Sequence, residues 1–416
     1  MSASSQASAQ KVLVFDFGAQ YGQLIARRVR YLHVYSEIVP CDITAEEVRE
    51  LSPSAIILSG GPASVNAEDA PRVDPAIYEL GVPVLGFCYG HQITAVTLGG
   101  TMFHPEVGEY GPATLHVEGG ALFEGTPTDQ TVWMSHFDAV YDVPEGFTVV
   151  ASTDVCPVAA MENAEKRIYT TQFHPEVKHT EFGQQILSNF LFNVCKLEKN
   201  WSMDNLVETM TAEFREKVGV DRVILALSGG VDSSVVAALG ARAIGKQMTC
   251  VFINHGLLRK GEPEQVEEVF TKQFDVDFIH VHAEDRYAEL LAGVTEPEQK
   301  RRIIGTQFWK EFFAVAQQLE TDGKPVKYLA QGTIYPDIIE SGARKTGGKA
   351  ATIKSHHNLI PFPEGVHFDL IEPLDHFFKD EVRALGTALG LPDHIVHRQP
   401  FPGPGLAIRI IGAVSP

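Results

Sequence analysis

The sequence predicts an α/β protein made of two parallel-sheet, three-layer domains. In the first half, short apolar runs at 11–15 (KVLVF), 55–58 (AIIL) and 82–87 (VPVLGF) are separated by stretches with helical character, such as 21–31. Buried strands that alternate with helices are typical of a parallel sheet covered on both faces. At 416 residues the chain is also too long for one ordinary domain.

The second half repeats this pattern with different turn chemistry. The run at 223–227 (VILAL) predicts a buried strand, 228–234 (SGGVDSS) a tight turn, and 235–243 a helix. Further strands are expected at 248–253, 277–281 and 328–331. The stretch 335–355 is rich in Gly, Lys and Arg and has no apolar period, so it is predicted to be a mobile loop.

Changes in composition along the chain divide it into five segments. We expect a disordered polar tail, a first domain, a linker, a second domain and the start of a further segment, at 1–10, 11–196, 197–203, 204–400 and 401–416 respectively.

The bulk composition excludes several classes of protein. The formal net charge is -19, and so acidic a surface disfavours binding to the phosphate backbone of nucleic acids. The five cysteines are scattered and include no CxxC pair, which argues against a disulfide framework or structural zinc and suits the cytoplasm. The polar first segment does not resemble a signal peptide, and no apolar run reaches the roughly 18 residues of a membrane helix.

Cys88 stands between Gly86 and Gly90, where a predicted strand meets a helix. Small flanking residues permit the sharp turn that exposes a nucleophile at a sheet edge. The start of a helix also favours a thiolate and supplies N–H groups for an oxyanion. A buried structural cysteine is the alternative, because free cysteines usually lie in a core. The two glycines favour the nucleophile.

A nucleophilic thiol needs a base and a group that orients the base. The tripeptide HPE at 174–176 offers both, because proline keeps the chain extended and residues two apart then share a face. An identical tripeptide stands at 104–106. Spacing alone leaves the choice between His174 and His104 open.

The turn SGGVDSS has the composition of an anion-binding loop. Its glycines let the backbone approach an anion closely, and its serines add donors at the positive end of the predicted helix. It is not a Walker A loop, because no GK[ST] ends it, and a plain Gly–Ser turn is the alternative. The candidate ATP-binding residues are Ser228, Gly229, Gly230, Val231, Asp232, Ser233 and Ser234.

Three motifs of the first half resemble the class I, or triad, glutamine amidotransferase family: GGP at 60–62, GFCYGHQ at 86–92 and QFHPE at 172–176. The resemblance implies a flavodoxin-like domain that hydrolyses glutamine to ammonia, with the second HPE supplying the base. The implied triad is Cys88, His174 and Glu176, and the implied oxyanion ligands are Gly61 and the backbone N–H of Tyr89. Phe137 departs from the family, which usually has Gly there, and is expected to narrow the glutamine entrance.

The motif SGGxDS resembles the pyrophosphate loop of the adenylating ATP pyrophosphatase superfamily, which has an adenine-nucleotide-hydrolase-like fold. Together with LAQGTIYPDIIES at 329–341 and PFPGPGLAIR at 400–409, it makes the whole chain resemble the glutamine-hydrolysing GMP synthase family. The resemblance implies that ATP adenylates XMP with release of pyrophosphate and that ammonia displaces AMP to give GMP. The alternatives are another glutamine-dependent adenylating amidotransferase and an inactive nucleotide-binding paralogue.

The resemblance also implies roles for single residues of the second half. It assigns Arg301 to XMP, and it makes Asp232 a ligand of the Mg²⁺ that accompanies ATP. The implied lid residues are Asp337, Glu340 and Lys354. Asn254 stands where the family usually has Asp, so a slower synthetase half is expected if that carboxylate assists magnesium binding or lid closure.

The family continues into a small C-terminal dimerisation domain. The resemblance makes 401–416 the start of that domain, the rest of which is absent from this sequence. A homodimer is therefore expected where the domain is present.

Overall fold

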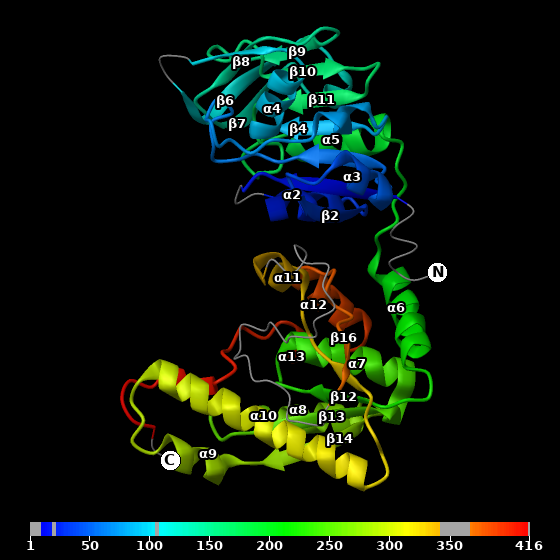
Figure 1. Ribbon diagram of the computed structural model, residues 1–416, viewed down its shortest axis with the longest axis vertical. Helices are drawn as coiled ribbons and strands as arrows, with labels where there is room; N and C mark the ends of the chain where they lie inside the picture. The colour runs from blue at the N-terminus through cyan, green and yellow to red at the C-terminus, as the bar shows by residue number, and fades with distance from the viewer. Residues whose placement is uncertain (1–9, 19–21, 105–107, 342–366, 415–416) are drawn as a thin grey trace. The chain divides into compact units, whose positions relative to one another are not determined.

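The computed structural model describes residues 10–18, 22–104, 108–341 and 367–414 (Figure 1). The chain divides into two compact units, Ala3–Ser202 and Met203–Pro416. The predicted tail lies outside the described residues except for Gln10, which accepts a hydrogen bond from the Glu198 N–H at 2.8 Å.

The first unit is built on a nine-stranded sheet in the order β2-β1-β3-β4-β11-β10-β9-β6-β7. The first five strands are parallel to their neighbours and the others are antiparallel, so the α/β prediction is confirmed but this sheet is mixed. Its strands are β1 Lys11–Asp16, β2 Tyr35–Pro40, β3 Ala55–Leu58, β4 Val84–Phe87, β6 Glu109–Val117, β7 Asp129–His136, β9 Thr148–Ser152, β10 Ala160–Asn163 and β11 Ile168–Thr171. A two-stranded sheet pairs β5 Thr101–Phe103 with β8 Ala139–Asp142.

Helices complete the first unit around a core that contains the fully buried Phe15, Leu58 and Ile93. The helices are α2 Gly22–Tyr31, α3 Ala45–Leu51, α4 Tyr89–Thr97, α5 Gly183–Ser188 and the π-helix η3 Asn189–Val194, with short 3-10 turns η1 Pro75–Glu79 and η2 Ala121–Phe123. The segment predicted as a linker is packed in part, because the Trp201 ring lies 4.8 Å from the Tyr35 ring.

The second unit has a five-stranded, wholly parallel sheet in the order β14-β13-β12-β15-β16. Its strands are β12 Val223–Ala226, β13 Met248–Asn254, β14 Asp277–His282, β15 Tyr328–Ala330 and β16 Asp369–Ile371. Its helices are α6 Met203–Val218, α7 Val231–Ile244, η4 Gly245–Gln247, α8 Glu262–Lys272, α9 Glu284–Leu291, α10 Pro297–Thr321, α11 Tyr335–Ser341, α12 Lys379–Ala388, α13 Asp393–Val396 and η6 Gly405–Ile408. The chain adds strands on one side of β12 and then on the other, so the sheet has a switch point between β12 and β15, where open α/β sheets bind ligands.

The loop prediction for 335–355 is wrong at its start, where the structure has helix α11. Tyr335 is fully buried and its ring lies 5.3 Å from that of Phe378. The Asp337 carboxylate accepts the Ile334 N–H at 3.0 Å. These tertiary and capping contacts stabilise a turn of helix that shows no apolar period in the sequence. The remainder of the predicted loop, including Lys354, lies outside the described residues.

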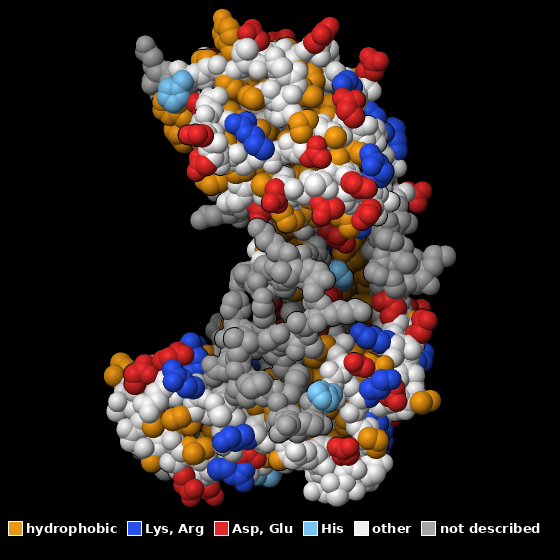
Figure 2. Space-filling view, viewed as in Figure 1, with side chains coloured by type: hydrophobic (Ala, Val, Ile, Leu, Met, Phe, Trp, Pro, Cys, Tyr) orange, Lys and Arg blue, Asp and Glu red, His pale blue; other side chains and the backbone are white. Residues whose placement is uncertain are grey.

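Charged side chains of both signs are interspersed on the face shown in Figure 2. Within the described ranges, no helix combines the length and apolarity that a membrane crossing requires.

Helix α10 carries a fully buried lysine, Lys300, whose ammonium group donates to backbone carbonyls. Its Nζ donates to the carbonyl oxygens of Ala407 at 3.1 Å, Ile410 at 2.9 Å and Gly412 at 2.6 Å. An ammonium group has three N–H donors, so all of them are used. The lysine thus attaches the 405–412 segment to α10.

Replacing Lys300 with Met should therefore destabilise the second unit. The three carbonyls would lose their donor, and each buried unsatisfied group costs about 1–3 kcal/mol. We expect a loss of about 2 kcal/mol or more, seen as a fall of at least about 4 °C in the Tm of this unit by calorimetry. Lys310→Met, at an exposed position of the same helix, is the matched control and should change stability by less than about 0.5 kcal/mol. Equal Tm values for the two variants would contradict the role of Lys300.

Candidate active sites

Cys88 joins β4 to α4 in a strained turn. Its φ is 49° and its ψ is -101°, a conformation that a residue with a side chain rarely adopts outside functional sites. The flanking glycines make the turn possible. A Cβ on Gly86 would lie 2.6 Å from the Gly90 carbonyl oxygen, and one on Gly90 would lie 2.4 Å from the Leu58 carbonyl oxygen. The backbone thus packs as tightly as the predicted nucleophile turn requires.

The structure brings His174 and Glu176 to Cys88. The His174 Nδ1 lies 2.8 Å from the Glu176 Oε1, and a hydrogen bond joins the side chains of His174 and Cys88. A Cβ on Gly60 would lie 3.0 Å from the His174 ring and 3.6 Å from the Cys88 Cβ, so both side chains converge on this glycine. All three side chains of the group are buried.

The charge state of His174 follows from its surroundings. Burial of the ring opposes its protonation, but the Glu176 carboxylate and the hydrogen bonds with Cys88 and Glu176 outweigh burial and raise the pKa of His174 to about 11. The site therefore favours an imidazolium at neutral pH, and a positively charged neighbour of this kind stabilises the thiolate form of a cysteine nucleophile.

The two predicted oxyanion ligands lie together beside Cys88. A Cβ on Gly61 would be 3.2 Å from the Tyr89 Cγ. Tyr89 is the first residue of α4, where backbone N–H groups have no partner inside the helix. Among the described residues, neither the Gly61 N–H nor the Tyr89 N–H has a hydrogen-bond acceptor. Both donors are thus available to a ligand.

The other candidate base, His104, lies in a different environment. Its side chain is 70% exposed, and its Nδ1 lies 2.7 Å from the Asp138 Oδ1. The ring of Phe137, the residue that departs from the family, packs 4.2 Å from the His104 ring. Glu106 lies outside the described residues. The narrowing of the glutamine entrance by Phe137 stays a prediction.

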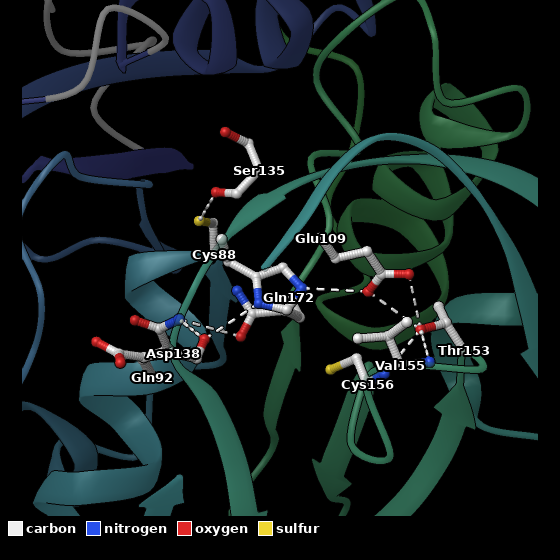
Figure 3. A network of polar contacts seen from close by, with 10 residues as sticks. Cys88, Gln92, Glu109, Ser135, Asp138, Thr153, Val155, Cys156 and Gln172 are labelled. Atoms are coloured by element: carbon white, nitrogen blue, oxygen red, sulfur yellow. Dashed lines mark hydrogen bonds and ion pairs between the residues drawn. The ribbon is translucent and has the colours of Figure 1, made fainter. Parts of the chain in front are cut away.

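Sequence reasoning missed the polar network that surrounds the thiol (Figure 3). The Cys88 Sγ donates to the Ser135 carbonyl oxygen at 3.6 Å. Gln92 donates to the Asp138 carbonyl oxygen at 2.7 Å and to the Gln172 Oε1 at 3.2 Å, which fixes the strand end that carries Ser135. The sequence offered one signal for this network: Gln92 and Gln172 are polar residues inside the motifs GFCYGHQ and QFHPE. The structure shows that both are buried.

The phosphate-loop candidate lies at the switch point of the second sheet. Gly229 has a left-handed φ of 74°, and α7 begins directly after Gly230. The hydroxyls of Ser228 and Ser233 lie 3.0 Å apart and close the loop on itself. A Cβ on Gly332, just after β15, would lie 3.0 Å from the Asp232 Cβ. The loop is therefore held between the ends of β12 and β15.

Asp232 is paired with Lys379, a residue that sequence reasoning missed. The Lys379 Nζ donates to both carboxylate oxygens, at 2.7 Å and 2.6 Å. Burial raises the pKa of the Asp232 carboxyl and the negative charge of Asp337 adds to this, against the opposing effect of Lys379. Lys379 stands 147 residues from Asp232 at the start of α12, so local sequence carries no signal for the pair.

The remaining predicted residues are placed as follows. Arg301 lies on α10, with a half-exposed side chain whose Nη1 is 3.2 Å from the Glu298 carboxylate. Glu340 lies in α11, but its side chain is outside the described residues, as is all of Lys354. Asn254 donates from its amide to the Glu284 Oε1 at 2.5 Å. An aspartate at 254 would place two carboxylates against each other at this point.

Two family models match parts of this chain. The family described as Glutamine amidotransferase class-I matches residues 13–194, and the family described as NAD synthase matches 203–303. A glutamine amidotransferase structure from Thermotoga maritima covers 45% of this chain and 98% of its own, with 17% identity and a TM-score of 0.36.

Two relatives cover nearly all of this chain. A Clostridium acetobutylicum protein named GMP synthase, glutamine-hydrolyzing, is 54% identical over 98% of this chain and 78% of its own length. A Streptomyces avermitilis protein of the same name is 55% identical over 100% of this chain and 79% of its own length. The chain therefore belongs to the glutamine-hydrolysing GMP synthase family.

Proposed function

We propose that this chain makes GMP by dividing the reaction between its two units. The first unit hydrolyses glutamine to ammonia. The second uses ATP to adenylate XMP with release of pyrophosphate, and ammonia then displaces AMP. The single observation that carries this proposal is the presence, in one chain of this family, of a buried Cys–His–Glu group and a glycine-rich loop at a sheet switch point.

In the first unit, Cys88 is proposed as the nucleophile. Its thiolate attacks the side-chain amide carbon of glutamine, and the N–H groups of Gly61 and Tyr89 bind the oxygen that becomes negative. The His174 imidazolium gives its proton to the departing ammonia, and a thioester remains. His174 then takes a proton from the water that hydrolyses the thioester to glutamate. Glu176 keeps the ring oriented and stabilises its charge, in line with the 2.8 Å contact.

In the second unit, residues 228–234 are proposed to hold the β- and γ-phosphates of ATP. The loop offers backbone N–H groups, two hydroxyls and the positive end of α7. Lys379 adds a cation beside Asp232, where it can neutralise the pyrophosphate that leaves. Arg301 is proposed to contact XMP, and Asp337 to act near the α-phosphate.

The residues around the loop fit a magnesium ion that arrives with ATP. The described part of the chain contains no group of three or more side chains able to hold a metal by themselves. Mg²⁺ is usually bound by one or two carboxylates together with substrate phosphates and water. Asp232 would be the protein ligand, and the ion would supply charge neutralisation for the leaving pyrophosphate.

We also propose a cytoplasmic location, which is supported by five cysteines that are all free thiols. The proposal of a homodimer rests on the family resemblance.

Cys88→Ser should abolish GMP synthesis from glutamine but not from added ammonium. The thiol serves only to release ammonia, so the fall with glutamine should reach about 10³-fold. GMP formation with each nitrogen source is the measurement. Cys195→Ser, at a half-buried free thiol of the same unit, is the control and should keep both activities. Loss of both activities in Cys88→Ser would show that this thiol is structural.

His174→Ala should lower glutamine hydrolysis by about 10²–10⁴-fold, because it removes the proposed acid and base. His104→Ala removes the same side chain from an identical tripeptide and should leave the rate near that of the parent. Glutamate release measures both. An inactive His104→Ala variant beside an active His174→Ala variant would reverse the triad assignment.

Asp232→Asn should suppress pyrophosphate release with either nitrogen source. A 10²-fold fall corresponds to about 2.7 kcal/mol of transition-state stabilisation, a reasonable value for one metal-linked charge. Asp221→Asn is the matched control, because Asp221 also pairs with a lysine, at 2.7 Å from the Lys327 Nζ, but on the surface. ATP turnover within twofold of the parent in Asp232→Asn would refute the role of this carboxylate.

A further inference from the structure

A buried arginine holds the phosphate loop from outside the loop. Arg398 follows α13 and stands 169 residues from Gly229. Its Nη1 donates to the Gly229 carbonyl oxygen at 2.9 Å and to the Glu262 Oε1 at 2.6 Å, and its Nη2 donates to the Gln265 Oε1 at 3.3 Å. The side chains of Arg398 and Glu262 are only 10% and 5% exposed.

The partner carboxylate also packs directly on the loop. A Cβ on Gly229 would lie 2.9 Å from the Glu262 Oε1, so a side chain here would displace this carboxylate as well as strain the left-handed φ. The second Glu262 oxygen accepts the Arg259 N–H at 3.1 Å. Both carboxylate oxygens therefore have partners, and the guanidinium is fixed between Glu262 and the loop.

This contact determines which way one N–H group of the loop points. The peptide between Gly229 and Gly230 is planar and trans, so its C=O and N–H point in opposite directions. With the oxygen held by Arg398, the Gly230 N–H is directed to the other side, where it meets the Ser228 hydroxyl at 3.3 Å. Because both residues are glycine, this peptide would otherwise rotate at little cost.

We propose that Arg398, oriented by Glu262, is a positioning residue for ATP. It holds the Gly229–Gly230 peptide so that the Gly230 N–H faces the β- and γ-phosphates. The inference rests on the proposed role of this loop. A buried ion pair adds little net stability compared with well-packed apolar residues, so orientation accounts for the pair better than stability does.

Arg398→Met tests this inference, with ammonium as the nitrogen source and pyrophosphate release as the readout. The KM for ATP should rise about 10-fold or more, the equivalent of one lost hydrogen bond to an anion, while the KM for XMP stays within about twofold. Arg398→Lys should lie between the parent and Arg398→Met. A lysine can reach the carbonyl or the carboxylate but lacks the planar fork that serves both.

Arg215→Met is the matched control. The Arg215 Nε donates to the Ala243 carbonyl oxygen at 2.8 Å, near the opposite end of the same helix α7. The Arg215→Met variant therefore loses a hydrogen bond from a guanidinium to a backbone carbonyl, as Arg398→Met does, but leaves the 228–234 loop unchanged. Its KM for ATP should equal that of the parent even if its Tm falls. Equal values of KM for ATP in Arg398→Met and Arg215→Met would overturn the inference.

Binding of inorganic pyrophosphate, followed by calorimetry, separates this inference from the proposed function because it needs no turnover. Weaker binding by Arg398→Met or Arg398→Lys than by the parent supports the positioning role. If Arg398→Met does not fold and Arg398→Lys binds pyrophosphate as the parent does, Arg398 is structural and the inference is wrong. A parent protein that binds pyrophosphate but releases none from ATP and XMP would contradict the proposed function alone.

Discussion

The close approach of backbone to backbone at Gly90 is the constraint on which the first site depends. No side chain fits between α4 and the end of β3, because a Cβ there would lie 2.4 Å from the Leu58 carbonyl oxygen. This contact seats the first turn of α4 against the sheet, and the left-handed turn at Cys88 follows from it. The thiol, the Tyr89 N–H and the Gly61 loop then meet at one point. A strained backbone of this kind persists only where surrounding packing determines it.

The second unit forms its donor-rich loop by a different route. Its glycines are needed for the direction of the peptide as well as for space, because Gly229 is left-handed and touches Glu262. The strain of the first site is stabilised by buried packing of backbone on backbone, as between Gly90 and Leu58. The second loop is held by charged groups from distant parts of the chain, namely Lys379 and Arg398. A single substitution of a distant charged residue can therefore disturb the phosphate loop, whereas the Cys88 turn is sensitive to substitutions of its packed glycines.

Elements whose signal is local could be predicted from the sequence. Strands β1, β3, β4 and β12 are continuous apolar runs with polar turns after them, and each was placed to within about two residues. Strand β7 was missed because its residues alternate between exposed and buried positions, which gives no continuous apolar run. Helix α11 was missed because its stability comes from contacts such as that of Tyr335 with Phe378, far away in the sequence.

The residues of the candidate sites also divide into those with a local sequence signal and those that depend on distant contacts. The thiol turn and the phosphate loop have a local composition that indicates their chemistry, whereas spacing could not separate His174 from His104. The structure separates the two by their surroundings: His174 is buried beside Cys88, and His104 is exposed beside Asp138. Lys379 and Arg398 had no local signal, since each is brought to the loop by the parallel fold across about 150 residues or more.

The buried Lys300 has a consequence for how the last described segment moves. Its ammonium donates to three backbone carbonyls of the 405–412 segment, and none of its hydrogen-bond partners among the described residues is a carboxylate. If that segment lifted away, a bare cation would remain in an apolar interior, at a large cost in solvation. Residues 405–412 therefore cannot detach from α10 one at a time. They open together or with the whole unit, so this segment belongs to the most cooperative part of the fold.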